Sequence, residues 1–202
     1  MKVLAFIIAV MAGAVLLLTF SLPAHAASHD ARLDTVATAI AGHPVVAVCA
    51  DSTVEWATWE TQVAGGIELD GFTQLAVGPN IYLAPHICKT LLAGLQVGPT
   101  AVGIYWYSLA IKTILHEAVH QRGITDEGMT DCTALTLVRQ YALSSFGFTL
   151  TVPKTVIASK LVKGKRVYFT KTITVPNPAL AMLDQYAHAW HAVLPANYQG
   201  GC

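Results

Sequence analysis

The chain has 202 residues, of which 54% are hydrophobic and 12% are charged, and its formal net charge at pH 7 is zero. This length suffices for one domain with a buried core, and the absence of internal repeats and low-complexity stretches excludes a repeat protein. The charge is unevenly distributed, because residues 27–132 hold eleven acids and four bases whereas residues 133–202 hold seven bases and one acid.

The first 26 residues have the pattern of an export signal. Lys2 supplies a positive end, residues 3–20 are nearly all apolar, and an A-x-A pattern ends at Ala26. We expect cleavage after Ala26, which leaves a single domain over residues 27–202 of a secreted protein. The alternative is a retained membrane anchor, because about eighteen apolar residues are just long enough to span a bilayer.

Four cysteines lie in the part that remains after cleavage: Cys49, Cys88, Cys132 and Cys202. An even number of cysteines in an exported chain favours two disulfide bonds, and the sequence leaves three connectivities open. A cysteine-ligated metal site is the competing interpretation, but the chain has no C-x-x-C pair.

Hydrophobic periodicity predicts the first half of the domain as a helix followed by short strands. We expect a helix over residues 29–41, a strand over 45–49, and a hairpin of strands 72–77 and 81–84 in a small mixed sheet. Residues 51–70 have no clear assignment, although Trp56 and Trp59 are expected to pack and Gly65-Gly66 to form a turn. His43 and His86, each beside a proline, are interpreted as loop residues.

Two consecutive helices are predicted at the centre of the chain. The first runs over about residues 100–122 and ends at Gly123, and the second begins at a cap supplied by Thr125 or Asp126 and continues to about Phe146. A β-hairpin over residues 149–175, with its turn near Gly164, precedes a last helix over 177–193. The fold class predicted from these elements is α+β.

The stretch "HEAVHQRGITDEGMTDC" gathers two histidines and several carboxylates in a chain with few charges. His116 and His120 are four residues apart, so their rings project from one helical face toward the same point. Glu117 lies beside that point and is able to take a proton from a bound water. This is the H-E-x-x-H pattern, in which the two histidines bind Zn²⁺ and the glutamate is the general base.

A catalytic zinc site usually has three protein ligands, and two acids compete for the third position. Asp126 has the spacing H-x-x-G-x-x-D used by metzincin peptidases, although Met129 is too close and Met182 falls in a predicted helix, so neither supplies that group's methionine turn. Glu127 is the favoured ligand. Asp131, four residues later on the same helical face, is then placed to accept a hydrogen bond from a ligand histidine.

The E-x-x-x-D pattern after H-E-x-x-H resembles the gluzincin-type peptidases, in which a helical glutamate is the third ligand. "HEAVHQRGI-DE---DC-A" also looks like a group of exported bacterial metallopeptidase-like proteins with a very short link between the two helices. The resemblance covers about twenty residues. It implies a zincin-like fold, in which the H-E-x-x-H helix is followed directly by a second ligand helix.

The function expected from these residues is that of a zinc metallopeptidase acting on a peptide or protein substrate. Glu117 would take a proton from the metal-bound water and pass it to the leaving amine. Candidate donors to the oxyanion are Tyr186, His188, His191 and Tyr198, with no spacing that selects one. Two alternatives stay open: a cell-wall amide hydrolase, and a non-catalytic metal-binding or interaction protein.

The predicted hairpin is strongly basic. Residues 154–171 contain no acid and six cations: Lys154, Lys160, Lys163, Lys165, Arg166 and Lys171. One interpretation is a solvated ribbon whose charges prevent edge-to-edge aggregation. The other is an arm that attracts an acidic polymer or an anionic surface. We expect no nucleic-acid partner, because the exported chain lacks any recognition motif, and we expect a monomer.

Overall fold

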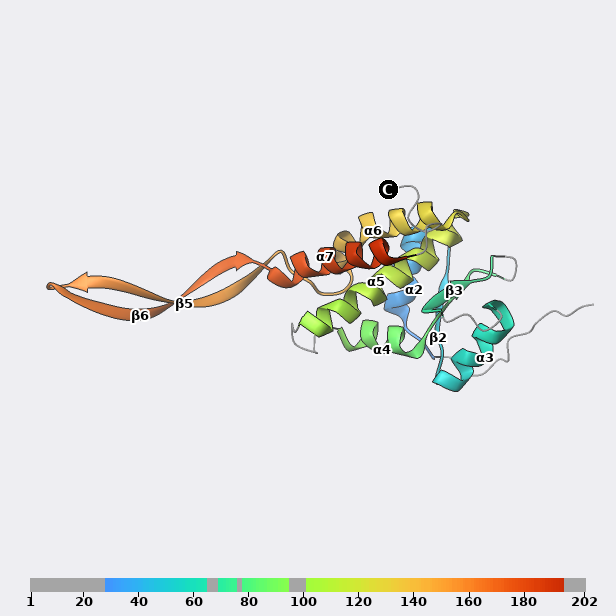
Figure 1. Cartoon of the computed structure of the whole chain (residues 1–202), viewed down its shortest axis with the longest axis horizontal. Coiled ribbons are helices and arrows are strands. Elements are labelled where there is room, and N and C mark those ends of the chain that lie inside the picture. The colour runs from blue at the N-terminus through green and yellow to red at the C-terminus, as the bar shows by residue number, and fades with distance from the viewer. Residues whose placement is uncertain (1–27, 65–68, 76–77, 95–100, 195–202) are drawn as a thin grey trace, which may run out of the picture.

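The computed structural model describes residues 28–64, 69–75, 78–94 and 101–194, so the predicted signal peptide and the C-terminal tail lie outside the described residues. In Figure 1 the helices gather around a small sheet, and a long two-stranded hairpin projects from them on one side. The mixture of helices with two small sheets confirms the predicted α+β class.

The four-stranded sheet is mixed, as predicted. Its strands lie in the order β1-β2-β4-β3, with bounds Ser28–His29, Val46–Cys49, Asn80–Leu83 and Gly71–Thr73 respectively. Strands β2 and β4 are parallel, and the other two pairs are antiparallel. The β3–β4 pair confirms the predicted hairpin, although β3 ends at Thr73 and residues 76–77 are not described. Within the described residues, β3 is an edge strand.

An aromatic cluster fixes helix α3 (Thr53–Ala64) against one face of this sheet. Trp56 and Trp59 are buried, as expected, and project one turn apart toward Phe72 and Tyr82. The ring centroids of Trp59 and Tyr82 are 5.3 Å apart, and those of the stacked pair Phe72 and Tyr82 are 4.9 Å apart. The segment that the sequence left unassigned is therefore largely a helix. The predicted turn at residues 65–66 lies outside the described residues.

The opposite face of the sheet contacts helix α5 (Ala101–Gln121) so closely that Gly71 is required. A Cβ built on Gly71 would lie 2.9 Å from Thr113 Cγ2 and 3.1 Å from Glu117 Cγ. Neighbouring strand residues point to opposite faces, so Phe72 reaches α3 while Gly71 and Thr73 face α5. Gln121 Nε2 donates hydrogen bonds to Thr73 Oγ1 and to a carbonyl of β4, which ties the end of α5 to the hairpin.

Helix α5 is the central element of the domain. Every residue from Tyr107 to Leu115 is buried, because α5 packs against α2 (Ala31–Ala41), α4 (Pro85–Ala93), α6 (Glu127–Ser144) and α7 (Pro178–Val193). Gly123, with φ +87°, ends the helix, and its N–H donates to the His120 carbonyl. These boundaries confirm the two predicted central helices.

One disulfide bond joins Cys49 at the end of β2 to Cys88 on α4, with Cα atoms 5.9 Å apart. Cys132 on α6 is also disulfide-bonded. Both observations agree with the predicted use of cysteines in disulfides. His86, predicted to be a loop residue, instead lies in the first turn of α4, where Nε2 is 2.9 Å from an Asp70 oxygen. That prediction was wrong because Pro85 begins the helix.

The hairpin consists of β5 (Thr151–Val162) and β6 (Lys165–Pro176), paired along their whole length. Lys163 and Gly164 form its two-residue turn, both with positive φ, as the predicted turn near Gly164 requires. Asn177 then caps α7 by accepting a hydrogen bond from the Ala179 N–H. Among the described residues, no helix combines the length and apolar character needed to cross a membrane.

Candidate metal centre

The two histidines of the H-E-x-x-H pattern lie on the last two turns of α5 and face the start of α6. Their ring centroids are 4.7 Å apart, and their Nε2 atoms are 3.0 Å apart. The chain turns back at Gly123, so Glu127, the first residue of α6, lies beside both rings. The tight joint predicted between the helices therefore brings together three side chains from two elements.

His116, His120 and Glu127 form a group that could hold a metal ion. Oε2 of Glu127 lies 3.1 Å from the Nε2 atom of His116 and 3.3 Å from that of His120. Around a tetrahedral zinc ion with bonds of about 2.0–2.2 Å, ligand atoms lie roughly 3.3–3.6 Å apart. The three atoms are thus nearly spaced as one face of such a tetrahedron.

The outer nitrogen of each histidine also faces an acceptor. Nδ1 of His120 donates to the Ile124 carbonyl at 2.7 Å, and Nδ1 of His116 lies 3.5 Å from Oδ1 of Asp131. When such an imidazole is neutral, a proton held on Nδ1 leaves the lone pair of Nε2 directed at the centre, which is the tautomer that a metal ligand needs. Asp131 thus lies beside His116, and its role as partner of a metal-bound histidine stays a prediction.

Lys112 and His191 both contact Asp131, and the sequence predicted neither contact. The Asp131 side chain is 1% exposed; Nζ of Lys112 contacts Oδ1, and Nδ1 of His191 lies 2.5 Å from Oδ2. Lys112 is one turn before His116 on the same face of α5, so the helical spacing was a usable signal. His191 comes from α7, sixty residues further along the chain, and no local pattern pairs it with Asp131.

The electrostatics of the group favour positive charge at its centre. Burial alone would lower the pKa of His116, but hydrogen bonds to Asp131 and Glu127 raise it to about 9. Burial raises the pKa of Asp131, yet its bonds to His116 and Lys112 hold it at about 2. The hydrogen bond from His116 lowers the pKa of Glu127. Both carboxylates are therefore ionised at neutral pH and attract a cation.

Glu117 is buried beside the three candidate ligands without being one of them. Burial raises the pKa of its carboxyl, and the positive charges on His116 and His120 partly oppose this shift. A raised pKa brings a carboxylate closer to the basicity that a proton acceptor needs at neutral pH. A Cβ on Gly71 would lie 3.1 Å from Glu117 Cγ, so the backbone of β3 passes close to the Glu117 side chain and restricts its position.

A cavity of about 310 Å³ opens over the group and is bordered by β3. Ten residues line it: Leu69, Gly71, Phe72, Thr73, Leu75, His116, Glu117, His120, Thr125 and Glu127. The Ala84 N–H donates to the Asp70 carbonyl, so by antiparallel alternation the backbone groups of Gly71 and Thr73 point to the outer edge of the sheet. An extended chain entering the cavity meets an edge with which it could pair.

Asp126, the alternative third ligand, has a different role. Its carboxylate caps α6 by accepting a hydrogen bond of 2.7 Å from the Met129 N–H. It is Glu127, not Asp126, that groups with His116 and His120. The same contact identifies Asp126, rather than Thr125, as the helix cap.

The predicted oxyanion donors are not part of the cavity lining as described. The ring of Tyr186 packs edge-on against Tyr105, His188 is exposed on α7, and His191 is engaged with Asp131. Tyr198 lies outside the described residues. His43, the remaining histidine considered in the sequence, bonds through Nε2 to the Gln121 carbonyl at 2.8 Å and so supports the end of α5.

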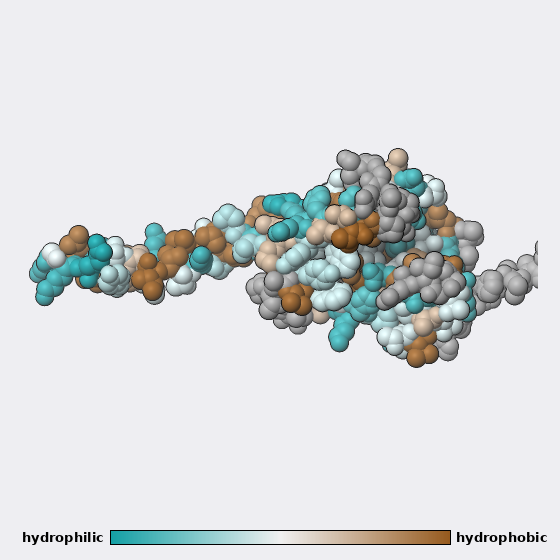
Figure 2. Space-filling model, in the orientation of Figure 1, coloured by the Kyte–Doolittle hydropathy of each residue, from teal (hydrophilic) through white to brown (hydrophobic). Residues whose placement is uncertain are grey.

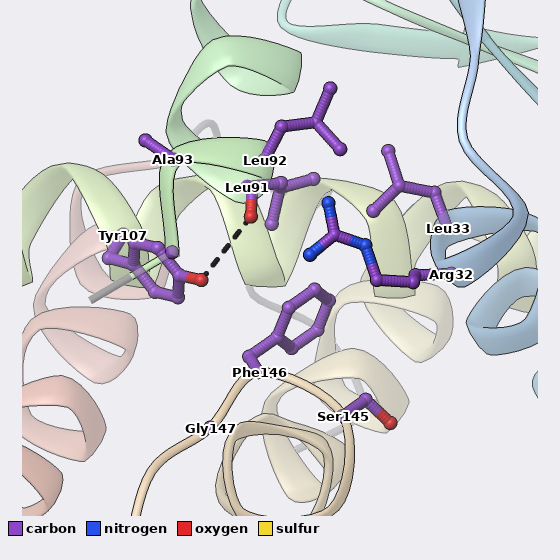
Figure 3. Close-up of a pocket in the computed structure, with 10 residues that line it drawn as sticks. Arg32, Leu33, Leu91, Leu92, Ala93, Tyr107, Ser145, Phe146 and Gly147 are labelled. Atoms are coloured by element: carbon purple, nitrogen blue, oxygen red, sulfur yellow. Dashed lines mark hydrogen bonds between the residues drawn. The ribbon is translucent and has the colours of Figure 1, made fainter. Parts of the chain in front are cut away.

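A second cavity, of about 320 Å³, lies between the start of α2 and the end of α4 and has no comparable chemistry. Figure 3 shows its lining, in which Leu33, Leu91 and Phe146 surround the guanidinium group of Arg32. Arg32 already pairs with Asp30 through Nε at 3.0 Å, and the Tyr107 hydroxyl donates to the Leu91 carbonyl. This cavity therefore holds no cluster of titratable side chains comparable with that of the candidate metal centre.

Comparisons with protein-family models, with curated proteins and with solved structures give no match for this chain.

Proposed function

We propose that this protein is an exported zinc metallopeptidase that hydrolyses peptide bonds. His116, His120 and Glu127 would hold the ion, and Glu117 would act as general base. The observation that carries the proposal is the triangle of two Nε2 atoms and one carboxylate oxygen, 3.0–3.3 Å apart, with the buried carboxyl of Glu117 beside it. Two imidazoles and one carboxylate are a common ligand set for catalytic zinc.

When bound, zinc lowers the pKa of a coordinated water and polarises the scissile carbonyl. The protein's own groups then determine where protons go. Glu117 accepts the proton of the attacking water and delivers it to the leaving amine. Asp131 holds His116 in the orientation and tautomer that binding requires, and Lys112 and His191 in turn fix Asp131.

The edge of β3 supports a peptide as the substrate. A peptide in extended conformation could pair with the outward backbone groups of Gly71 and Thr73, which border the cavity. Such pairing would align the peptide along the metal centre without demanding one side-chain sequence. The gluzincin-like order of H-E-x-x-H, glutamate and aspartate is consistent with this chemistry. We also propose that the domain has a zincin-like fold.

Export is proposed from the sequence of residues 1–26, and the Cys49–Cys88 disulfide is compatible with it. Disulfide bonds form and persist chiefly in oxidising compartments outside the cytosol.

The decisive experiment compares the wild type with Glu117→Gln, each loaded with zinc, on unfolded casein. We expect one zinc per chain in both proteins and cleavage lowered about 10²- to 10⁴-fold in the variant, because only the proton acceptor is removed. Asp184→Asn, which changes an acid on α7 that pairs with Arg139 at the surface, is the matched control and should cleave as the wild type does. Equal cleavage of casein by all three proteins would contradict the mechanism. Release of fragments from peptidoglycan without cleavage of casein would favour a cell-wall amide hydrolase.

A further inference from the structure

The β5–β6 hairpin, residues 151–176, forms an arm that extends from the rest of the molecule (Figure 1). Each strand has 12 residues, which at about 3.3 Å per residue gives a length of roughly 40 Å. An isolated two-stranded ribbon is marginally stable in water at best. The stability of so long an arm therefore requires an explanation beyond the pairing of its two strands.

The charge of the arm is opposite to that of the body. The arm holds six bases and no acid, whereas the remainder of residues 27–202 holds twelve acids and five bases. A net charge of about +6 on the arm thus faces a net charge of about −7 elsewhere. The tip of the arm lies roughly 40 Å from its base, which exceeds the Debye length of about 8 Å at physiological salt, so salt screens the tip from the charge of the body. An anionic surface at the tip would attract the arm with little repulsion of the body.

Charge alone does not explain the arm, because large apolar side chains are exposed on both of its faces. The pairs Leu161–Arg166, Ser159–Tyr168 and Ile157–Thr170 alternate with Val162–Lys165, Lys160–Val167 and Ala158–Phe169 along the ladder. One face therefore carries Ile157, Leu161 and Tyr168, which are 78%, 71% and 66% exposed. The other carries Val162, Val167 and Phe169, each more than 40% exposed.

The apolar and basic residues alternate along the arm, as the brown and teal patches of Figure 2 show. A ribbon that used lysines only to prevent edge-to-edge pairing would have no need of exposed aliphatic and aromatic side chains. A flat protein surface would cover one face and leave the other three apolar residues in water. An environment that surrounds the ribbon would accommodate both faces at once.

We propose that the distal half of the arm binds the interface of an anionic lipid bilayer. Ile157, Leu161, Val162, Val167, Tyr168 and Phe169 would enter the boundary between headgroups and acyl chains. Lys160, Lys163, Lys165 and Arg166 would contact lipid phosphates, because basic side chains interleaved with apolar ones suit this boundary. The site does not depend on the metal centre and would hold the acidic body above the membrane.

The test is cosedimentation of the full chain with two kinds of vesicle: phosphatidylcholine alone, and equimolar phosphatidylcholine and phosphatidylglycerol. We expect binding to the second kind only, weakened by added salt. Replacing Lys160, Lys163, Lys165 and Arg166 together with glutamine should weaken binding roughly a hundredfold or more. Replacing Ile157, Leu161 and Tyr168 with serine should weaken it about tenfold or more, through lost apolar burial.

A matched control changes one exposed apolar and one basic residue of the body, Val54→Ser with Lys89→Gln, and should bind as the wild type does. A reporter variant, Tyr168→Trp, keeps the test informative if the serine variant loses the hairpin. All four native tryptophans, at positions 56, 59, 106 and 190, lie outside the arm. We expect the fluorescence emission of the tryptophan added at position 168 to shift to the blue with anionic vesicles and not to shift with phosphatidylcholine vesicles.

Three results would overturn the proposal. The first is no binding to anionic vesicles, or binding that the body control loses as strongly as the arm variants. The second is binding that a soluble polyanion, poly-glutamate, abolishes, that the serine variant retains, and that gives no blue shift in the Tyr168→Trp variant, which would indicate an acidic polymer. The third is self-association in sedimentation velocity that the arm variants lose, which would identify a second copy as the partner.

Discussion

The candidate metal centre and the β5–β6 arm each place side chains in the environment opposite to their usual one. At the centre, Lys112, Glu117 and Asp131 are charged or titratable groups that the fold buries, two of them in contact with each other. On the arm, Ile157 and Leu161 are apolar groups that the fold leaves mostly in water. Both arrangements run against the usual distribution of residues between interior and surface.

The two regions are stabilised in different ways. A buried charge is tolerated only with partners, and the partners of Asp131 come from α5 and α7, so the whole helical body supports the centre. The arm has its ladder and a base where Asn177 bonds to the carbonyls of Thr149 and Leu150. Changes at the centre should therefore affect stability and chemistry together, whereas changes on the arm should affect neither.

The largest expected effect is that of His116→Ala on zinc binding. Removal of one of three ligands should lower zinc affinity by at least about 10³-fold, because a site with two protein ligands is weak. Isothermal titration of chelator-treated protein measures this directly. His188→Ala, which removes an exposed histidine of α7, should leave the affinity unchanged. Equal affinity in both variants would show that zinc binds elsewhere.

Asp131→Asn should lower both stability and metal affinity. The variant leaves Lys112 buried without its counter-charge, which costs about 3–5 kcal/mol of unfolding free energy, and loosens His116, which costs about 10- to 100-fold in affinity. Asp184→Asn is the matched control, because Asp184 pairs with Arg139 on the surface and should cost under about 1 kcal/mol. Similar losses in urea unfolding for the two variants would contradict the buried network.

The stability of the chelator-treated protein should fall as the pH rises from about 6.5 to 9. The folded-state pKa of His116 is raised from 6.5 to about 9, so its contribution is complete below 6.5 and is lost as pH rises through 9. Asp131 acts in the opposite direction, since its contribution is lost as pH falls from 3.8 toward 2. Thermal melts across this range should show an alkaline decrease equivalent to a few kcal/mol, which His116→Asn removes. An unchanged slope in that variant would assign the effect to another group.

The smallest expected effect is that of the arm on the body. Replacing Ile157, Leu161 and Tyr168 with serine should change the unfolding free energy of the body by less than about 0.5 kcal/mol per residue and leave zinc affinity unaltered. Thermal melts and zinc titration of this variant provide the measurement. A large loss of either would mean that the arm and the centre form one cooperative unit, and the contrast between them would then be wrong.

The sequence predicted the elements whose signals are local. The helix ends at Gly42 and Gly123, the cap at Asn177 and the turn at Gly164 follow from backbone preferences of single residues, and the structure has them there. The triangle of His116, His120 and Glu127 was likewise predictable, since a spacing of four on one helix and a glycine turn bring its three members together.

The features that the sequence did not predict depend on tertiary contacts. Helix α3 escaped assignment because Trp56 and Trp59 are placed by contact with Phe72 and Tyr82 rather than by a long apolar stripe. The bond between His191 and Asp131 joins residues sixty positions apart, so no window of sequence contains both. The extent of the arm agrees with the hairpin predicted over residues 149–175. That apolar residues lie on both of its faces became evident only from the register of the two strands.

The proposed function requires one ion bound between α5 and α6, and an anomalous-scattering map from zinc-loaded crystals tests this most directly. We expect a single strong zinc peak about 2.0–2.2 Å from Nε2 of His116, Nε2 of His120 and a carboxylate oxygen of Glu127. A peak at Asp126, a peak away from these side chains, or no peak at saturating zinc with both histidines intact would contradict it.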